Sequence, residues 1–371
     1  MARKGSNIYK RKDGRWEGRF RIPETGKYRS VYGKTYGEAR ENLIALQKHT
    51  VQPTQKCKLT VKELFELWLG HNRHNLKEST FANYQMKLNL HIYPALGGIK
   101  FDVLTSKHID DFINEKLSCG RIGGGKLSSK YVSDMVVLLK SLGKFAEEVY
   151  HYNNPVKNIA APKIRQKELE LPAKHVQQTL VNFLTKNLAK ANSLCGRLLG
   201  ILLCLYTGIR LGELCALKWS DIDFVEQSVK INKTVQRVKS FDGKTKTKLI
   251  VTPPKSEKSN REIPLPDFLF ELLLKYRKSP DCYILSGTGK LAEPRLMQYY
   301  FKTILKKANL PSINFHATRH IFATTCLERG FDVKTLSEIL GHATVELTLN
   351  RYVHSSKERK RECMGKLQLA C

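Results

Sequence analysis

The stretch "LLGILLCLYTGIRLGELCALKW", residues 198–219, is the most apolar part of the chain and decides how its largest segment folds. It predicts a buried helix, a break at Gly208 and a second, shorter helix. Arg210 follows the break directly. A guanidinium beside a buried helix needs an anionic partner, because a buried unpaired charge costs several kcal/mol. The partner is either a bound anion or Glu213, three residues further on.

Downstream, "PPKSEKSNREIPL" at residues 253–265 places Lys255 and Lys258 at a strand turn, where a solvated surface lysine is the simple interpretation of each. "HATRH" at residues 316–320 places His316 and Arg319 three residues apart, on one helical face. A His/Arg pair suits an oxyanion and a transferable proton better than a metal ion, which the arginine would repel.

The last motif is "LGHATVELTLNRYVH", residues 340–354, in which His342 follows a glycine break and Tyr352 comes ten residues later. Tyr352 is either the rim of an amphipathic helix or a nucleophile. None of these motifs contains an aspartate, which argues against a Ser-His-Asp set, and their isolated glutamates do not form paired carboxylates for Mg²⁺. A cationic pocket with a phenol remains.

Composition narrows the class of partner. The chain has 371 residues and a formal net charge of +30, from 64 Lys+Arg against 34 Asp+Glu, which favours nucleic acid because neutralised phosphates release counterions. No apolar run reaches the length of a membrane-spanning helix. The first residues, "MARKGSNIYKRK", lack an apolar signal core, and nine cysteines form no C-x-x-C pair, so we expect a cytoplasmic protein with reduced thiols and no bound metal.

Residues 1–56 carry 14 Lys+Arg and 5 Asp+Glu. Alternating apolar and polar residues with turn signals at Asp13-Gly14 and 23–26 predict a three-stranded antiparallel sheet, and Thr35-x-x-Glu38 predicts a capped helix through about Lys48. Its open face is basic, which fits either a solvated surface or a sheet that reads DNA grooves. The candidate DNA contacts here are Arg15, Arg19, Arg21, Lys27 and Arg29.

Residues 57–165 are predicted to be all-helical, with Thr60-x-x-Glu63 as a capping box and further helices near 79–92, 106–118 and 129–150. "GRIGGGKLSS", residues 120–129, nearly matches a nucleotide-binding loop. Leu127 stands where the Mg²⁺-binding hydroxyl belongs, and a helix instead of a strand precedes the loop, so we interpret it as a flexible connection.

Residues 166–371 are predicted to form a mixed, mainly helical domain with a small β-sheet. "SVKINKTVQRVKSF", "KTKLIVTPPKS" and "REIPL" are the strands, and the basic turn "DGKTK" between them adds Lys244 and Lys246 to the candidate DNA contacts, together with Lys258. Linker character appears at 166–172. The tail at 355–371 is predicted to be an amphipathic basic helix, which either caps its own domain or docks on a neighbouring subunit.

The order Arg210, Lys255, His316, Arg319, His342, Tyr352 resembles the active site of the tyrosine recombinase (phage-type integrase) family. "GIRLGEL", "KSEKSNREIPL", "HATRHIFAT" and "LGHATVELTLNRYVH" look like that family's boxes. Residues 57–165 look like its core-binding domain. The amino-terminal sheet resembles the arm-binding domain of integrases from conjugative transposons and some phages.

The resemblance implies a DNA enzyme without metal or ATP. Tyr352 attacks the scissile phosphate to form a 3′-phosphotyrosyl bond, while Arg210 and Arg319 bind the phosphate oxygens and His342 donates a hydrogen bond. His316 assists removal of the tyrosine proton. Lys255 acts as general acid, with Lys258 near enough to compete for that assignment. Glu213 orients the pocket by holding Arg210 or His316.

It also implies the partners: double-stranded DNA with core and arm sites, three further protomers in a homotetramer on two sites, and a small excision factor as a candidate. The function is then integration and excision of a mobile element. Two alternatives stay open at this point: type IB topoisomerase-like strand relaxation, which uses the same attack, and a non-catalytic DNA-binding regulator that retains the fold.

Overall fold

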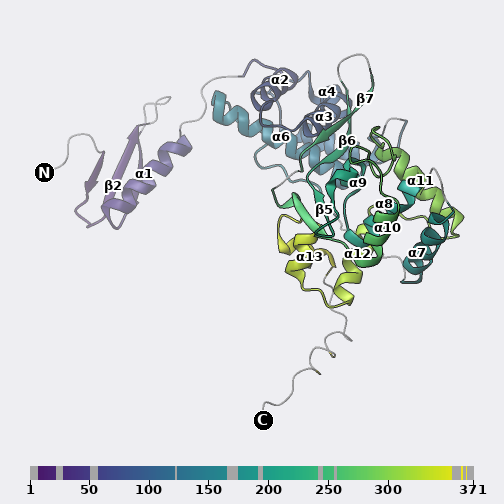
Figure 1. The fold of residues 1–371 in the computed structure, drawn as a ribbon. Helices are drawn as coiled ribbons and strands as arrows, with labels where there is room; N and C mark the ends of the chain where they lie inside the picture. Colours follow the sequence, from purple (N-terminus) through teal and green to yellow (C-terminus); the bar gives the residue numbers. More distant parts are fainter. Residues whose placement is uncertain are drawn as a thin grey trace, which may run out of the picture. The chain divides into compact units, whose positions relative to one another are not determined.

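The computed structural model describes residues 7–21, 28–50, 57–121, 123–164, 174–190, 195–240, 245–254, 257–352, 361 and 365. The chain divides into two compact units, Met1–Gln166 and Lys167–Cys371 (Figure 1). The predicted linker at 166–172 lies outside the described residues, as does the predicted tail helix apart from Arg361 and Gly365. The division into three domains at 56 and 165 stays a prediction.

The first unit begins with the predicted three-stranded antiparallel sheet, in the order β1-β2-β3 and followed by one helix. Thr35 Oγ1 accepts a hydrogen bond from the Glu38 backbone N–H at 3.2 Å, which confirms the cap. Gly33 lies against the helix so closely that a Cβ there would stand 2.4 Å from the Ala39 nitrogen. The elements are β1 (Ile8–Lys10), β2 (Trp16–Arg21), β3 (Tyr28–Gly33) and α1 (Tyr36–Thr50).

The helical part of the first unit has its own core, centred on Leu64, Phe65, Met135 and Leu139. Thr60 and Glu63 form the predicted capping box. The glycine-rich loop after Cys119 follows a helix, as predicted, and bends through three glycines with positive φ. The elements are α2 (Val61–Asn72), α3 (Glu78–Lys87), η1 (Leu88–Ile92), α4 (Tyr93–Leu96), α5 (Ser106–Cys119) and α6 (Ser129–Tyr150).

The second unit is built around the apolar helix α8 (Cys195–Thr207), which contacts helices on several sides (Figure 1). Its β region forms two small sheets, β4-β5-β8 and β6-β7, instead of the single sheet expected. The remaining elements are α7 (Lys174–Leu188), α9 (Leu211–Ala216), η2 (Trp219–Asp221), β4 (Ile222–Asp223), β5 (Ser228–Ile231), β6 (Thr234–Lys239), β7 (Thr247–Thr252), η3 (Glu257–Ser259), β8 (Arg261–Pro264), α10 (Asp267–Lys275), α11 (Pro294–Lys307), α12 (Ala317–Glu328), α13 (Val333–Leu340) and α14 (Val345–Tyr352).

Two glycine breaks bring the polar motifs together. Gly208 ends α8 with φ 64° and Gly341 ends α13 with φ 64°, a backbone conformation that favours glycine. A Cβ on Gly208 would stand 2.5 Å from Phe322 in α12 and 2.8 Å from Leu340 in α13. The end of α8 therefore packs directly against the two elements that carry the histidine motifs.

Within the described residues, no helix is both long and apolar enough to cross a membrane. The same residues contain no disulfide. Burial raises the pKa of the Cys215 thiol to about 12, so this side chain stays protonated in the core.

The close approach at Gly33 yields a prediction. Gly33→Ala forces backbone apart between β3 and α1 and should destabilise this small sheet by about 1–3 kcal/mol. The loss of stability is measured by amide hydrogen exchange in the full chain, where the amides of α1 should exchange faster in the variant than in the wild type. Gly37→Ala is the control, because the nearest atom to its Cβ is the Thr35 hydroxyl at 3.9 Å. Equal exchange in the two variants would contradict the packing argument.

Candidate active site

Arg210 is paired inside the protein, as the simpler of its two sequence interpretations predicted. Its Nη1 donates to Glu213 Oε1 at 2.8 Å and its backbone N–H to Oε2 at 2.9 Å. Nη2 donates to the Gly341 carbonyl at 3.2 Å. The side chain of Arg210 is 37% exposed, whereas that of Glu213 is 3% exposed. Arg210 is thus aimed by a buried carboxylate and still open to solvent.

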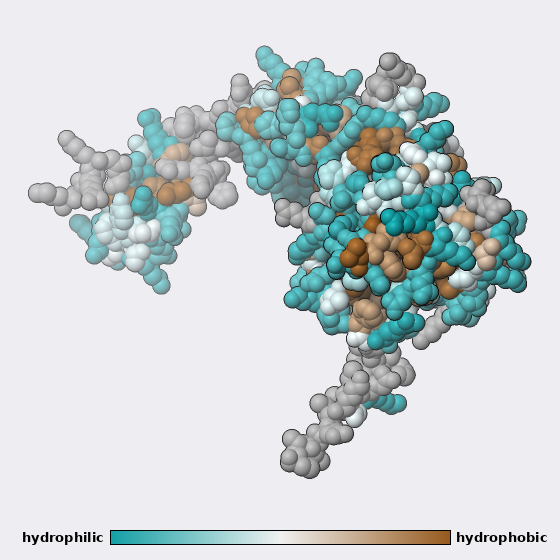
Figure 2. Space-filling model, viewed as in Figure 1, coloured by the Kyte–Doolittle hydropathy of each residue, from teal (hydrophilic) through white to brown (hydrophobic). Residues whose placement is uncertain are grey.

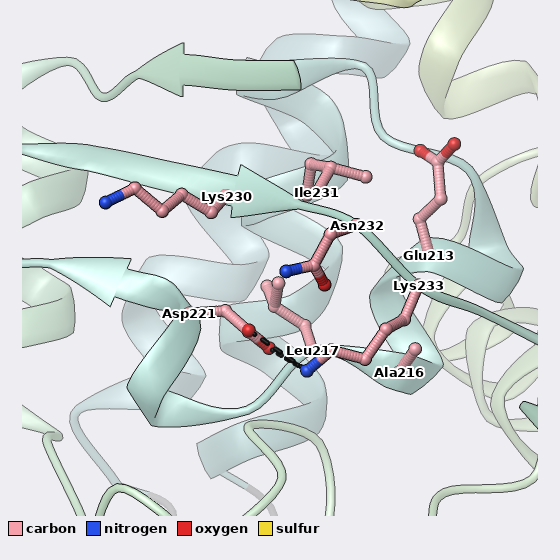
Figure 3. A pocket seen from close by; sticks show the side chains of 8 residues that line it. All are labelled: Glu213, Ala216, Leu217, Asp221, Lys230, Ile231, Asn232 and Lys233. Carbon is pink, nitrogen blue, oxygen red and sulfur yellow. Dashed lines mark hydrogen bonds and ion pairs between the residues drawn. The ribbon is translucent and has the colours of Figure 1, made fainter. Parts of the chain in front are cut away.

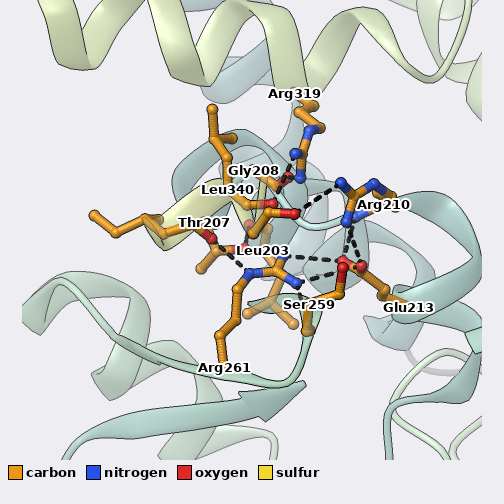
Figure 4. Close-up of polar contacts among 11 residues, drawn as sticks. Leu203, Thr207, Gly208, Arg210, Glu213, Ser259, Arg261, Arg319 and Leu340 are labelled. Carbon is orange, nitrogen blue, oxygen red and sulfur yellow. Dashed lines mark hydrogen bonds and ion pairs between the residues drawn. The ribbon is translucent and has the colours of Figure 1, made fainter. Parts of the chain in front are cut away.

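Arg261 is a site residue that the sequence reasoning missed. From β8, its Nη2 and Nη1 bind the two oxygens of Glu213 at 3.0 and 3.3 Å, and its Nε donates to the Ile339 carbonyl at 2.6 Å (Figure 4). A signal existed: alternation along β8 places Arg261 on the same face as the buried Ile263. A charge on the core face of a strand requires a buried partner.

Arg319, in α12, is the second arginine expected at the phosphate, and it is a buried member of this site. It is 2% exposed, and its Nη1 and Nη2 donate to the carbonyls of Gly208 and Leu340 at 2.8 and 2.7 Å. Burial follows from the position of α12, which packs on α8. Arg319 therefore binds the backbone at both glycine breaks, at Gly208 and directly before Gly341. Its positive charge is buried beneath the site.

Three arginines thus bind three consecutive carbonyls at the end of α13. Ile339 accepts from Arg261 and Gly341 from Arg210. Leu340 accepts from Arg319 (Figure 4). The last carbonyls of a helix have no partner within it and carry the negative end of its dipole. This helix end therefore collects cations that come from three separate elements.

One of the two motif histidines, His342, directly adjoins this arginine cluster in the chain. His342 follows Gly341, and its Nδ1 hydrogen-bonds the buried hydroxyl of Thr348 in α14 at 2.7 Å. Because Nδ1 is bound to Thr348, the other ring nitrogen of His342, Nε2, points away from Thr348. His316 is exposed and precedes the first residue of α12, with its ring 4.7 Å from that of His320.

The lysine and tyrosine motifs are only partly described. Lys255 lies outside the described residues. Lys258 is exposed and donates to the Ala343 carbonyl at 3.0 Å, next to His342. Tyr352 is the last residue of α14, and its side chain lies outside the described part. Because α14 contacts both α12 and α13, the backbone that carries the phenol packs against the elements of the arginine cluster.

The predicted DNA contacts in the turns are a separate group. Lys27 and Lys244 lie outside the described residues, and Lys246 is exposed just before β7. Arg29 pairs with Phe20 across the strands, so it lies on the helix side of the sheet and not on the open face expected for it.

The open face of the amino-terminal sheet is organised around Glu17. This carboxylate is 1% exposed and accepts from Arg19 at 2.8 Å, Ser30 at 2.7 Å and Arg11 at 2.8 Å. The hydrogen bonds from Arg19 and Ser30 lower its pKa to about 2, against the effect of burial. Arg21 is exposed on the same face by alternation.

Tyrosines flank these arginines. The Arg19 guanidinium lies 5.3 Å from the Tyr9 ring centre, and Arg15 lies 5.5 Å from that of Tyr32. Arg15 also pairs with Asp13 at 2.8 Å. A guanidinium held over an exposed ring keeps a fixed direction. This suits contact with a DNA groove better than a freely moving, solvated side chain would.

Glu213 also lines a small pocket (Figure 3). Lys233 and Asp221 pair across it at 3.1 Å, and the Glu213 carboxylate points away from this pair. Because Lys233 and Asp221 pair with each other, we interpret the pocket as part of the structural framework and not as a binding site. It is lined by Glu213, Ala216, Leu217, Asp221, Lys230, Ile231, Asn232 and Lys233. Among the described residues, His, Cys, Asp and Glu form no cluster suited to a metal ion.

Comparison with known proteins identifies the family. Residues 171–359, half of the chain, match the phage integrase family, and residues 60–117 match the phage integrase N-terminal SAM-like domain. The chain belongs to the phage integrase family. It is therefore a tyrosine recombinase, an enzyme that recombines DNA at specific sites. This confirms the resemblance seen in the four motifs.

Individual relatives extend the match over almost the whole chain. A XerC-like tyrosine recombinase of Caldanaerobacter subterraneus subsp. tengcongensis is 29% identical, covering 91% of this chain and 91% of its own. The Tn1549 transposon integrase bound to a circular intermediate DNA superposes with a TM-score of 0.65 at 20% identity, covering 84% and 100% of the two chains. A lambda integrase tetramer bound to a Holliday junction gives 0.54 at 21% identity, covering 91% and 96%.

The Glu17 contacts predict an acid titration. The carboxyl ¹³C shift of Glu17 should titrate with a midpoint near pH 2, since its pKa is lowered to about 2. Because this pKa lies below the unfolded value, Glu17 stabilises the sheet above about pH 4.5, and the stabilisation is lost as the pH falls toward 2. Arg19→Ala should raise the midpoint. Arg29→Ala, on the other face, should leave it unchanged, and a midpoint near 4.5 in the wild type would contradict the contacts.

Proposed function

We propose that this recombinase integrates and excises a mobile genetic element, cutting and rejoining DNA through a 3′-phosphotyrosyl intermediate. One observation carries the proposal: Arg210 and Arg319, from motifs far apart in the sequence, bind the adjacent carbonyls of Gly341 and Leu340, directly before His342. The similarity to a transposon integrase supports a mobile element as the DNA that is moved.

The arginine cluster supplies what a phenol nucleophile lacks. A tyrosine of pKa about 10 is only about 0.1% ionised at pH 7, so Tyr352 needs nearby cations and a base. Arg210, which is partly exposed, contacts the non-bridging oxygens of the scissile phosphate. Arg319 adds its charge from the buried side. Both are in place before the reaction, so the charge of the pentavalent transition state is stabilised without reorganisation.

Proton transfers complete the step. The Tyr352 oxygen bonds to phosphorus as its proton passes to His316, and the bond from phosphorus to the 5′ oxygen breaks. A lysine protonates that leaving oxygen; we assign this role to Lys255, with Lys258 as the alternative because it already binds the Ala343 carbonyl beside the site. His342, oriented by Thr348, donates a hydrogen bond to the phosphate.

The covalent bond keeps the energy of the broken phosphodiester, so a 5′-hydroxyl from a second duplex can reverse the step without nucleotide hydrolysis. Exchange between two duplexes requires four cuts. We therefore propose a homotetramer on two DNA sites, a state in which lambda integrase is seen on a Holliday junction.

The remaining assignments follow from this reaction. Residues 57–165 and 166–371 act as core-binding and catalytic domains, and 1–56 as a domain for separate arm sites, with Arg15, Arg19 and Arg21 as its DNA contacts. A mobile element in a chromosome places the reaction in the cytoplasm. A small excision factor is the partner that would set the direction of the reaction. On the face shown in Figure 2, hydrophilic side chains cover most of the described surface. The formal net charge of +30 is what suits a polyanionic partner.

A nicked suicide duplex that carries the target site tests the chemistry. Wild-type protein should form an adduct that survives SDS, because the short strand released after attack cannot religate. Tyr352→Phe removes only the attacking oxygen and should form none. An adduct with the phenylalanine variant would show that another residue is the nucleophile. The absence of an adduct with wild-type protein would contradict the proposed reaction.

Two target sites in one assay separate recombination from strand relaxation. Recombinant products support the recombinase, whereas relaxed supercoils without recombinants would favour topoisomerase-like action. Binding without either product would favour a regulator.

The arm-site proposal predicts a selective defect. Arg19→Ala with Arg21→Ala should weaken binding to arm-type DNA and flatten its salt dependence by about 0.9 in slope for each lost phosphate contact, while core-site cleavage survives. Arg29→Ala is the matched control on the other face of the sheet. Amide exchange of β2 checks that the sheet stays folded. Equal loss of arm binding and core cleavage would contradict the two-site arrangement.

A further inference from the structure

Arg261 is the member of the arginine cluster that the proposed reaction does not use. Its side chain is 6% exposed. Its guanidinium reaches both oxygens of Glu213, the Ile339 carbonyl, and the Ser259 carbonyl at 3.2 Å. All four contacts are inside the protein. Arg261 therefore acts on the reaction through other residues and is not a catalytic residue.

Glu213 creates a conflict that Arg261 can resolve. The carboxylate orients Arg210 through two hydrogen bonds. However, a carboxylate that is paired with a single arginine also cancels most of the positive charge of that arginine. A neutral pair would attract a phosphate poorly. Arg261 binds the same carboxylate in a fork, so Glu213 divides its charge between two guanidiniums.

The charge of the arginine cluster matches that of the reacting phosphate. Arg210, Arg261 and Arg319 together with Glu213 leave a net charge of +2, from three cations and one anion. A phosphodiester attacked by a phenolate carries two negative charges in the pentavalent transition state. Without Arg261 the cluster would have one positive charge fewer than that transition state has negative charges.

We propose that Arg261 is a positioning residue that takes up the charge of Glu213, so that Arg210 is oriented by the carboxylate and keeps its own charge for the scissile phosphate. This inference rests on the proposed recombinase function. Burial raises the pKa of Glu213, but Arg261 and then Arg210 outweigh burial and lower it, so the carboxylate is ionised at neutral pH.

The same side chain also fixes the backbone before His342. A Cβ on Gly341 would stand 3.0 Å from Arg261 Cδ and 3.2 Å from its Nε. Arg261 therefore lies directly beside the glycine break, and its Nε contact with Ile339 ties β8 to the end of α13. Lysine keeps the charge but cannot fork onto both carboxylate oxygens while also binding this carbonyl.

A double-mutant cycle between Arg261 and Glu213 tests the proposal. The full-length variants Arg261→Met, Glu213→Gln and the double variant are compared in single-turnover cleavage of the nicked suicide duplex. Arg261→Met alone should slow cleavage at least about tenfold, because Glu213 then neutralises Arg210. In the Glu213→Gln background the same change should cost less than about threefold, because no carboxylate remains to be balanced.

A second substrate separates charge from general disorder. When a methyl group replaces one non-bridging oxygen of the scissile phosphate, the group to be bound is neutral, and the defect of Arg261→Met should shrink at least about threefold. Lys233→Met is the matched control: it removes a nearby cation paired with Asp221 and should cleave both substrates within about twofold of wild type. Thermal unfolding and binding of the uncut duplex check folding.

The outcomes are distinct. The inference is overturned if Arg261→Met slows cleavage equally with Glu213 and with Gln at position 213, and if its defect is the same with the neutral substrate. The proposed recombinase function would stand in that case. If Arg261→Met does not fold, the comparison of the double variant with Glu213→Gln decides: a loss of more than about threefold overturns the inference. Failure of the wild type itself to form an adduct counts against the proposed function, not against Arg261.

Discussion

The carboxylate of Glu213 accepts hydrogen bonds from Arg210 and Arg261, and most of the geometry of the site depends on this contact. It is 3% exposed, so it cannot exchange these partners for water. Removing one partner of such a buried pair typically costs about 3–5 kcal/mol, because the remaining charge is left uncompensated. The contact joins the first turn of α9 to strand β8 and sets the direction of the only one of the three guanidiniums here that is substantially exposed.

The end of α13 is the second constraint. The carbonyls of Ile339 and Leu340 and that of Gly341, which follows the helix, accept from three arginines. The left-handed conformation of Gly341 turns the chain so that His342 follows directly. Gly208 does the same at the end of α8, where Arg319 binds its carbonyl. The cations repel each other, and they are held together by carbonyl dipoles and one carboxylate. Such a site is built before any phosphate arrives, which is the condition for strong stabilisation of a transition state.

Much of this could be predicted from local pattern. The helix, glycine break and second helix at 198–219 follow from an apolar run interrupted by one glycine. The N-cap at Thr35 and the capping box at Thr60 follow from residue types three apart. Arg261 was not predicted. Alternation along β8 could have placed it on the core face, but its carboxylate partner lies 48 residues earlier in the chain and only the fold brings the two together. Likewise, nothing local shows that Arg319 is buried while Arg210 is open.

The sequence by itself determined the order of the chemical groups, the basic character of the chain, the element types and, through the four motifs, the family. Those properties are local: they depend on residue identity and on spacing within one helix or strand. The tertiary structure alone decided which arginine faces solvent, which carboxylate is shared and which face of the amino-terminal sheet carries Arg29. The reason is physical. Charge balance and burial depend on the distances between groups from different elements, and only the packed fold sets those distances.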